Sequence, residues 1–185
     1  MDYWLLKNLN MMTGQNLWLD AAVIFFAQFA ICFLPMITVL IYFLSNRSQK
    51  NKYQRALILL LFSLILAETI YLTISLVYHR PRPFLSHPAV YPLIDVASSS
   101  QSFPSNHTIL VFLFSLTILG VNQILGIVFL GLSILVGLSR IMAGVHYPSD
   151  VLAGIIVAIL STWLIKRIMK RWRCRVYYYF NRIWN

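Results

Sequence analysis

Residues 108–139 read TILVFLFSLTILGVNQILGIVFLGLSILVGLS and contain no charged residue. The run is too long for one membrane-spanning helix, which needs roughly 20 apolar residues. The polar pair Asn122 and Gln123 follows Gly120 in its middle, a combination typical of a tight turn. The sequence therefore predicts two antiparallel spans, over residues 105–121 and 123–141.

Three further apolar segments flank this run. Residues 21–44 carry no charge, and residues 56–78 are interrupted only by Glu68. A last segment covers about residues 148–165, which makes five predicted spans. Residues 1–18 are apolar and rich in aromatic side chains, a pattern that favours a helix lying in the membrane interface.

The predicted fold is therefore an all-α, polytopic membrane helical bundle. It has about five transmembrane helices and an N-terminal interfacial helix, in a single domain over residues 1–185. Of the 185 residues, 59% are hydrophobic and 11% are charged, which excludes a disordered chain. The two cysteines, Cys32 and Cys174, do not form a disulfide scaffold, and no C-x-x-C or H-E-x-x-H metal motif is present.

The net charge of +10 is unevenly placed along the chain. Eleven of the 15 basic residues lie in the loop 47–55 and the tail 166–185, which five spans place on one side. The positive-inside rule makes that side cytoplasmic, so the N-terminus and the segments 79–107 and 139–150 face outward. We interpret the basic, aromatic tail as a contact for anionic membrane lipids rather than for nucleic acid.

The first outward segment contains two groups suited to a phosphate. Arg82 lies between two prolines that end the second span, and a guanidinium can grip a phosphate in bidentate fashion. Ser105 and Asn106 precede the third span, where free N–H groups at a helix start bind anions, and His107 there could donate a proton. The alternatives are a snorkelling anchor for Arg82 and simple helix capping for Ser105 and Asn106.

The second outward segment contains Arg140, His146 and Asp150. Arg140 is a second candidate for holding phosphate. His146 and Asp150 are four residues apart, so Asp150 could hydrogen-bond one imidazole nitrogen and make the other nucleophilic. The alternative is a surface histidine next to an acidic helix start.

The order of these residues resembles the type 2 phosphatidic acid phosphatase superfamily. That family has the pattern KxxxxxxRP, PSGH and SRxxxxxHxxxD, and the third motif matches at every specified position. Within the family, the short chain and its PRPF run (residues 81–84) are most similar to undecaprenyl-diphosphate phosphatases of the bacitracin-resistance type. The matching residues are Arg82, Pro83, Pro104, Ser105, His107, Ser139, Arg140, His146 and Asp150.

Two positions differ from the family pattern. The family lysine is replaced by Ser75, and the family glycine of PSGH is replaced by Asn106. Phosphate binding by the first motif would therefore rest on Arg82, with possible help from Arg80. We interpret both changes as variation within the family.

The resemblance implies a cofactor-independent and metal-independent lipid phosphatase that works through a phosphohistidine. His146 would be the nucleophile, Asp150 would orient it, and His107 would be the general acid and base. The phosphate would be held by Arg82, Arg140, Ser105 and Asn106.

The resemblance also implies undecaprenyl diphosphate as substrate and an outward-facing site in a bacterial cytoplasmic membrane. Phosphatidylglycerol phosphate and phosphatidic acid remain alternative substrates. A transporter, and a metal site built from His107, His146 and Asp150, are the competing hypotheses. Glu68 is interpreted as a structural hydrogen-bonding group inside the bundle, with a role in substrate or proton handling as the alternative. The sequence does not predict the oligomeric state.

Overall fold

The computed structural model of the chain describes residues 1–96 and 101–183, and every regular element in those ranges is helical. Side chains are described up to residue 171, with that of Ser48 excepted. The elements, in chain order, are α1 (Asp2–Asn10), α2 (Leu17–Ile24), the π-helical turn η1 (Phe25–Phe29), α3 (Ala30–Leu44), α4 (Arg47–Val77), α5 (Pro83–Ser86), α6 (Asn106–Leu119), α7 (Gln123–Met142) and α8 (Pro148–Ile183).

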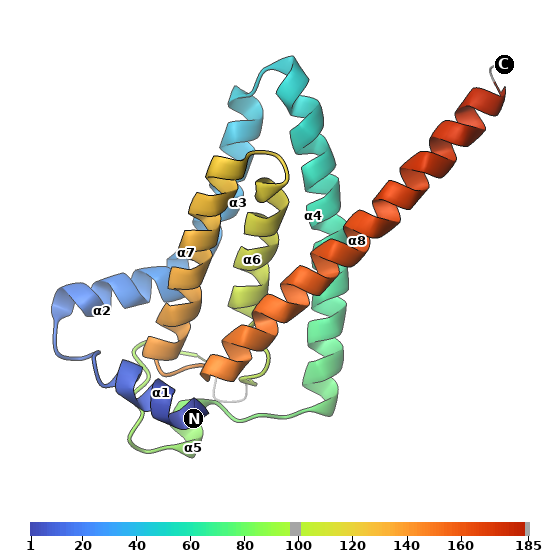
Figure 1. Cartoon of the computed structure of the whole chain (residues 1–185). Coiled ribbons are helices and arrows are strands. Elements are labelled where there is room, and N and C mark those ends of the chain that lie inside the picture. The colour runs from blue at the N-terminus through green and yellow to red at the C-terminus, as the bar shows by residue number, and fades with distance from the viewer. Residues whose placement is uncertain (97–100, 184–185) are drawn as a thin grey trace.

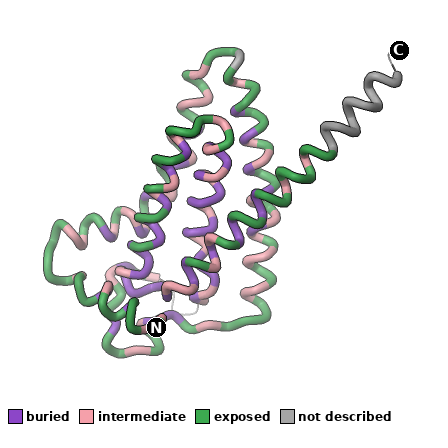
Figure 2. The backbone as a smooth tube through the Cα atoms, in the orientation of Figure 1, coloured by how far each residue is buried: buried purple, intermediate pink, exposed green. Residues whose placement is uncertain are grey.

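Helix α6 is the centre of the bundle, and it contacts α3, α4, α7 and α8 (Figure 1). More than half of its residues are buried, and buried positions gather along it in Figure 2. The core around it includes Ile109, Leu113, Phe129 and Val136. Because its neighbours shield α6, it needs no polar face along most of its length.

The predicted division of residues 108–139 into two helices is confirmed. Helix α6 ends at Leu119, and α7 begins at Gln123 after a turn in which the Oδ1 of Asn122 accepts a hydrogen bond from the N–H of Leu125 at 3.1 Å. The two helices run back along each other (Figure 1). Ser115 and Ser133 join them through a buried 2.7 Å hydrogen bond between their hydroxyls.

Each predicted membrane span corresponds to an apolar helical segment, in the predicted order along the chain. Within the described residues, four helical segments are long and apolar enough to cross a membrane: 17–44, 49–77, 123–142 and 148–171. The remaining predicted span, the third in chain order, is α6, a shorter apolar helix of 14 residues. Large apolar side chains such as Leu40, Ile65 and Leu160 are exposed on the outside, as lipid-facing positions require.

The first span differs from a single straight helix over residues 21–44. Helix α2 projects sideways from the bundle, and the chain turns at η1 before α3 follows the bundle axis (Figure 1). A π-helical turn accommodates an extra residue and is a common cause of such a bend. The bend brings the backbone of Ala27 against α7, where it accepts a hydrogen bond from Arg140.

The N-terminal segment is also more complex than the predicted helix over residues 1–18. Helix α1 ends at Asn10, and Gly14, with a φ of 80°, lies in the loop before α2. The apolar face of α1 packs on the protein, because Leu6 is fully buried beside Ile141, Tyr147 and Val151. Trp4 and Trp18 remain exposed, as the interfacial interpretation expects.

The two ends of the bundle carry different segments. Helices α1 and α5 lie at one end, and the α3–α4 and α6–α7 turns lie at the other, toward which α8 extends (Figure 1). The basic residues of 47–55 and 166–171 therefore share one end, as five spans predict. The side chains of the remaining tail, including Arg173, Arg175 and Arg182, lie outside the described residues.

The close approach of α6 and α7 depends on Gly126. A Cβ added there would collide with the backbone of Leu119, whereas a Cβ at Gly131 of the same helix would meet nothing within 4 Å. We expect Gly126→Ala to lower the free energy of unfolding by about 2–3 kcal/mol, because backbone cannot yield as a side chain can. Gly131→Ala should be neutral or slightly stabilising. Melting temperatures in detergent test this, and equal stability of the two variants would contradict it.

Candidate active site

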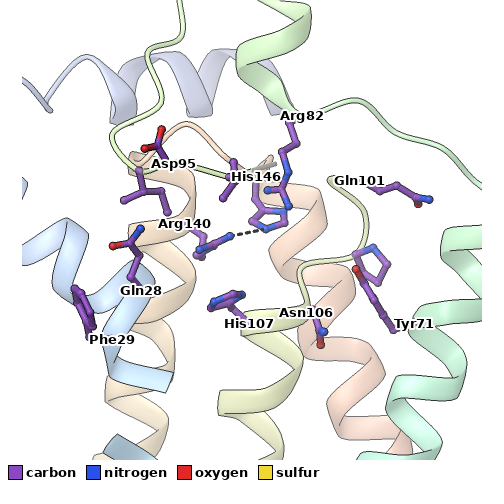
Figure 3. Close-up of a pocket in the computed structure, with 13 residues that line it drawn as sticks. Gln28, Phe29, Tyr71, Arg82, Asp95, Gln101, Asn106, His107, Arg140 and His146 are labelled. Atoms are coloured by element: carbon purple, nitrogen blue, oxygen red, sulfur yellow. Dashed lines mark hydrogen bonds between the residues drawn. The ribbon is translucent and has the colours of Figure 1, made fainter. Parts of the chain in front are cut away.

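A cavity of about 510 Å³ lies at the end of the bundle that carries α1 and α5. Five of the seven residues predicted for the site line it (Figure 3). One comes from the loop before α5, two from the first turn of α6, one from the end of α7 and one from the loop before α8. These residues are Arg82, Asn106, His107, Arg140 and His146. The predicted double crossing of residues 105–141 thus brings His107 and His146 to one cavity.

His146 is held in one tautomer by the backbone. Its Nδ1 lies 2.7 Å from the carbonyl oxygen of Ser102. Because a carbonyl can only accept, Nδ1 carries the proton and Nε2 carries the lone pair. Nε2 lies 3.3 Å from an Nη of Arg140, which can donate to it. The imidazole therefore presents a nucleophilic nitrogen beside a guanidinium.

Burial keeps this imidazole neutral. The side chain is 3% exposed, and this burial, together with the nearby charges of Arg140 and Arg82, lowers the pKa of His146 to about 4 despite the opposing effect of Asp150. A histidine in water has a pKa near 6.5. At neutral pH the free site therefore contains an unprotonated nucleophile.

Asp150 orients His146 in a different way from that expected. Its Oδ2 lies 3.7 Å from the Nδ1 of His146, beyond hydrogen-bond length. The same oxygen instead accepts from the Ser102 hydroxyl at 2.5 Å and from the Tyr147 N–H at 2.7 Å. Asp150 thus fixes Ser102, whose carbonyl accepts a hydrogen bond from Nδ1–H of His146. The carboxylate is still close enough to stabilise a positive charge on the ring.

Arg140 and Arg82 border the cavity next to His146 (Figure 3). Arg140 is 2% exposed and donates to the carbonyl of Ala27 at 2.9 Å, while its buried Nε has no hydrogen-bond partner within the described part of the chain. Arg82 is 7% exposed and donates to the carbonyl of Val145 at 3.0 Å. Both guanidinium groups line the same cavity as His146, so either could contact an anion bound next to that imidazole.

The residues at the start of α6 divide into two groups. His107 and Asn106 line the cavity, whereas the buried Ser105 does not, and its hydroxyl accepts from Thr108 at 3.0 Å. The hydroxyl makes no capping bond to the described helix, so helix capping does not account for Ser105. The assignment of Ser105 to phosphate binding stays a prediction.

Glu68 contacts the site through Asn106. The amide nitrogen of Asn106 lies 3.5 Å from Oε2 of Glu68, across the α4–α6 contact. This contact agrees with the interpretation of Glu68 as a structural hydrogen-bonding group. It also shows that Asn106, which stands where the family has glycine, provides a side chain that glycine lacks.

Arg80 has a role that the sequence analysis missed. Its guanidinium donates to Oδ1 of Asp150 at 2.6 Å and to Asp2 at 2.7 Å, and it lies over the ring of Tyr147 at 3.8 Å. Among the described residues Arg80 does not line the cavity, and its guanidinium is engaged by these two carboxylates. It neutralises the buried carboxylate that positions the His146 loop.

Asp2 completes this network from the N-terminal helix. Its carboxylate accepts from the N–H of Ser149 at 3.0 Å and from the hydroxyl of Ser149 at 2.6 Å. Nothing in the pattern of residues 1–18 predicted this contact, because a single acidic residue at a chain start gives no periodic signal. Other cavity-lining residues outside the motifs are Gln28, Tyr71, Asp95 and Gln101.

A metal ion in a protein needs a group of His, Cys, Asp or Glu side chains around it. Among the described residues, no group of three or more His, Cys, Asp or Glu side chains could hold an ion. His107, His146 and Asp150 are thus not grouped as metal ligands in the described structure, and the metal hypothesis is tested by the response of activity to chelator. The chemistry that the cavity offers is a nucleophile, a second imidazole and two guanidinium groups.

The sequence matches the model of the PAP2 superfamily over residues 56–174. This chain is a member of the PAP2 superfamily. It is 34% identical to undecaprenyl-diphosphatase BcrC of Bacillus subtilis, over 90% of this chain and 83% of that protein. It is 33% identical to the bacitracin transport permease protein BcrC of Bacillus licheniformis, over 80% of this chain and 70% of that protein. The predicted resemblance to the bacitracin-resistance type is confirmed, and the chain is a BcrC-like PAP2 protein.

Solved structures share the PAP2 fold. Aquifex aeolicus LpxE aligns with a TM-score of 0.72 at 21% identity, over 90% of this chain and 94% of that one. A PAP2-type phosphatidylglycerolphosphate phosphatase from Bacillus subtilis aligns with a TM-score of 0.66 at 21% identity, over 92% and 85% of the two chains. This PAP2 protein is thus a multi-pass membrane protein, as the apolar helices predict.

The contacts of Asp2 with Ser149 and Arg80, which tether α1 to the site, can be tested by substitution of Asp2. Asp2→Ala removes the acceptor of two Ser149 hydrogen bonds and one partner of Arg80, so we expect a loss of about 1–2 kcal/mol in the free energy of unfolding. Deuterium uptake by α1 should rise. Asp20→Ala is the matched control, because its carboxylate accepts from the exposed N–H of Gly14. Equal losses in both variants would contradict a specific tether.

Proposed function

We propose that this membrane lipid phosphatase hydrolyses undecaprenyl diphosphate to undecaprenyl phosphate through a phosphohistidine on His146. The observation that carries the proposal is the neutral imidazole of His146, which presents Nε2 beside Arg140 in a cavity that also contains His107 and Arg82. The similarity to the Bacillus subtilis undecaprenyl-diphosphatase over most of both chains supports this substrate.

In the first step, Nε2 of His146 attacks the terminal phosphorus of the diphosphate. The bond between that phosphorus and the bridging oxygen breaks, and undecaprenyl phosphate leaves with the electron pair. His107, whose protonation is favoured by the negative charge of the bound diphosphate, donates a proton to the leaving oxygen. Arg82 and Arg140 bind the remaining phosphoryl oxygens, on which charge is spread during the transfer.

In the second step, water attacks the phosphohistidine. His107, now neutral, takes a proton from the water, and inorganic phosphate leaves as the bond from phosphorus to Nε2 breaks. Covalent catalysis by histidine requires no metal ion. Loss of the proton from Nδ1 is opposed by the Ser102 carbonyl, and Asp150 stabilises the charge that Nε2 phosphorylation gives the ring.

The proposed location follows from charge. The four basic residues of 47–55, which the sequence analysis placed in a loop and which form the start of α4, lie at the end of the bundle opposite the cavity, together with the basic residues of 166–171 in α8. The positive-inside rule assigns the basic end to the cytoplasm. We therefore place the cavity at the outer surface of a bacterial cytoplasmic membrane, where a diphosphate headgroup can reach it.

The phosphohistidine can be trapped by changing His107. His107→Gln leaves the nucleophile intact but removes the acid of the first step and the base of the second. Undecaprenyl phosphate is a stable anion that can leave unprotonated, so hydrolysis of the phosphohistidine should slow more than its formation, and we expect turnover to fall by about 10²–10⁴-fold. Label from substrate carrying ³²P in the terminal phosphate should accumulate as acid-labile, base-stable phosphate on His146, with chelator present. His107→Gln/His146→Gln is the matched control and should acquire no label.

His87 lies outside the cavity and stacks on Tyr3, so His87→Gln should turn over substrate at the normal rate. Full turnover by His146→Gln would overturn the mechanism. So would label on another residue, or a loss of activity caused by chelator alone.

The pH profile provides an independent test. Attack requires neutral His146, whose pKa is about 4 because of burial and the adjacent arginines. The acidic limb due to this group should therefore appear only as the pH falls toward 4, and kcat/KM should persist at pH 5–6. The measurement is kcat/KM from pH 3.5 to 8, corrected for substrate ionisation by ³¹P NMR. An acidic limb of the enzyme near pH 6.5 would contradict the proposal, whereas a basic limb would report loss of the His107 proton.

A further inference from the structure

A second cavity, of about 520 Å³, lies at the opposite end of the bundle from the active site. Its walls come from the start of α4, the end of α6 with the following turn, and the middle of α8. Lys52 and Arg55 on α4 face it together with Lys166 and Lys170 on α8. Apolar side chains, among them Leu59 and Met169, form much of the remaining surface.

The four cations have no carboxylate to neutralise them. The chain contains five acidic residues, and the structure describes all of them. Glu68 is the nearest along α4, and it is 13 residues beyond Arg55, or roughly 20 Å at the helical rise. The others are Asp2, Asp20, Asp95 and Asp150, which belong to the active-site end.

Their spacing adds mutual repulsion. Lys52 and Arg55 are three residues apart and Lys166 and Lys170 are four apart, so each pair shares one helix face. Like charges at these spacings destabilise a helix, and here two such pairs border one cavity. An anion bound between α4 and α8 would remove this repulsion, and nothing in the described chain supplies one.

We propose that this cavity binds one anionic phospholipid, with the headgroup phosphate among Lys52, Arg55, Lys166 and Lys170. The apolar wall at Leu59 and Met169 would contact the start of an acyl chain. The neighbouring outer faces of α4 and α8 expose large apolar side chains such as Ile58 and Trp163, so the cavity adjoins lipid. Trp163, with Arg167 over its ring at 5.0 Å, is typical of the headgroup level.

A bound phospholipid differs from diffuse attraction between a basic surface and an anionic membrane. Diffuse attraction depends on the number of charges near the surface, whereas a cavity depends on which charges are removed. The chain allows a matched comparison. Arg55→Gln/Lys166→Gln removes one arginine and one lysine from the cavity, and Lys50→Gln/Arg167→Gln removes the same two residue types at the same end but outside it.

The experiment measures binding of phosphatidylglycerol to the full-length chain in a neutral detergent, by native mass spectrometry and by the rise in melting temperature. Removal of two cavity charges should weaken binding roughly thirtyfold, at about 1 kcal/mol per charge. The control pair should bind within about twofold of the unchanged protein. The charge-preserving Arg55→Lys/Lys166→Arg should also bind, which shows that any loss is not due to misfolding.

Two further probes test the chemistry of the occupant. Phosphatidylcholine with the same acyl chains should bind at least tenfold more weakly, because its headgroup carries no net charge. Glycerol phosphate, which lacks acyl chains, should bind weakly as well.

Equal weakening in the two Gln pairs would overturn the proposal in favour of diffuse attraction. If phosphatidylcholine binds as tightly as phosphatidylglycerol, the cavity is an apolar groove without selectivity for charge, and the proposal is wrong. If glycerol phosphate binds tightly, the cavity is a site for a soluble phosphate, and the proposal is also wrong. These measurements do not depend on turnover, so they stand apart from the proposed phosphatase mechanism.

Discussion

The burial of the Asp150 carboxylate determines how the active site is built. A buried charge is costly unless it is paired and hydrogen-bonded, and Asp150 is fully buried. Its two oxygens receive the guanidinium of Arg80, the hydroxyl of Ser102 and the N–H of Tyr147. Each donor belongs to a loop near the cavity, so satisfying one carboxylate fixes the ends of several helices against one another.

The same constraint explains why the N-terminal helix belongs to the site. Arg80 is shared between Asp150 and Asp2, and Ser149, next to Asp150 in the chain, donates twice to Asp2. Helix α1 then covers this network with Leu6, which is fully buried. A helix that composition alone assigns to the membrane interface is thus also a structural support for the loop of His146.

The sequence predicted those parts of the molecule that depend on local or strongly patterned signals. The turn at Asn122, the five spans and the family motifs all follow from uncharged runs, polar interruptions and fixed spacings. The bend at η1 was not predictable, because residues 21–44 are apolar on both sides of it and periodicity shows only helix. The roles of Asp2, Arg80 and Ser102 depend on contacts between segments 48 to 147 residues apart, which no spacing rule captures.

The arginines illustrate how a site can retain positive charge for a phosphate. Arg80 is paired with two carboxylates, so its positive charge is neutralised within the protein. Arg140 is instead held by the carbonyl of Ala27, a dipole that fixes its direction and leaves its net charge in place. The bend at η1 supplies that carbonyl, and a buried guanidinium without a counter-ion gains most from an arriving anion. The irregular first span is therefore part of the proposed phosphate site, although it contributes no charged residue to it.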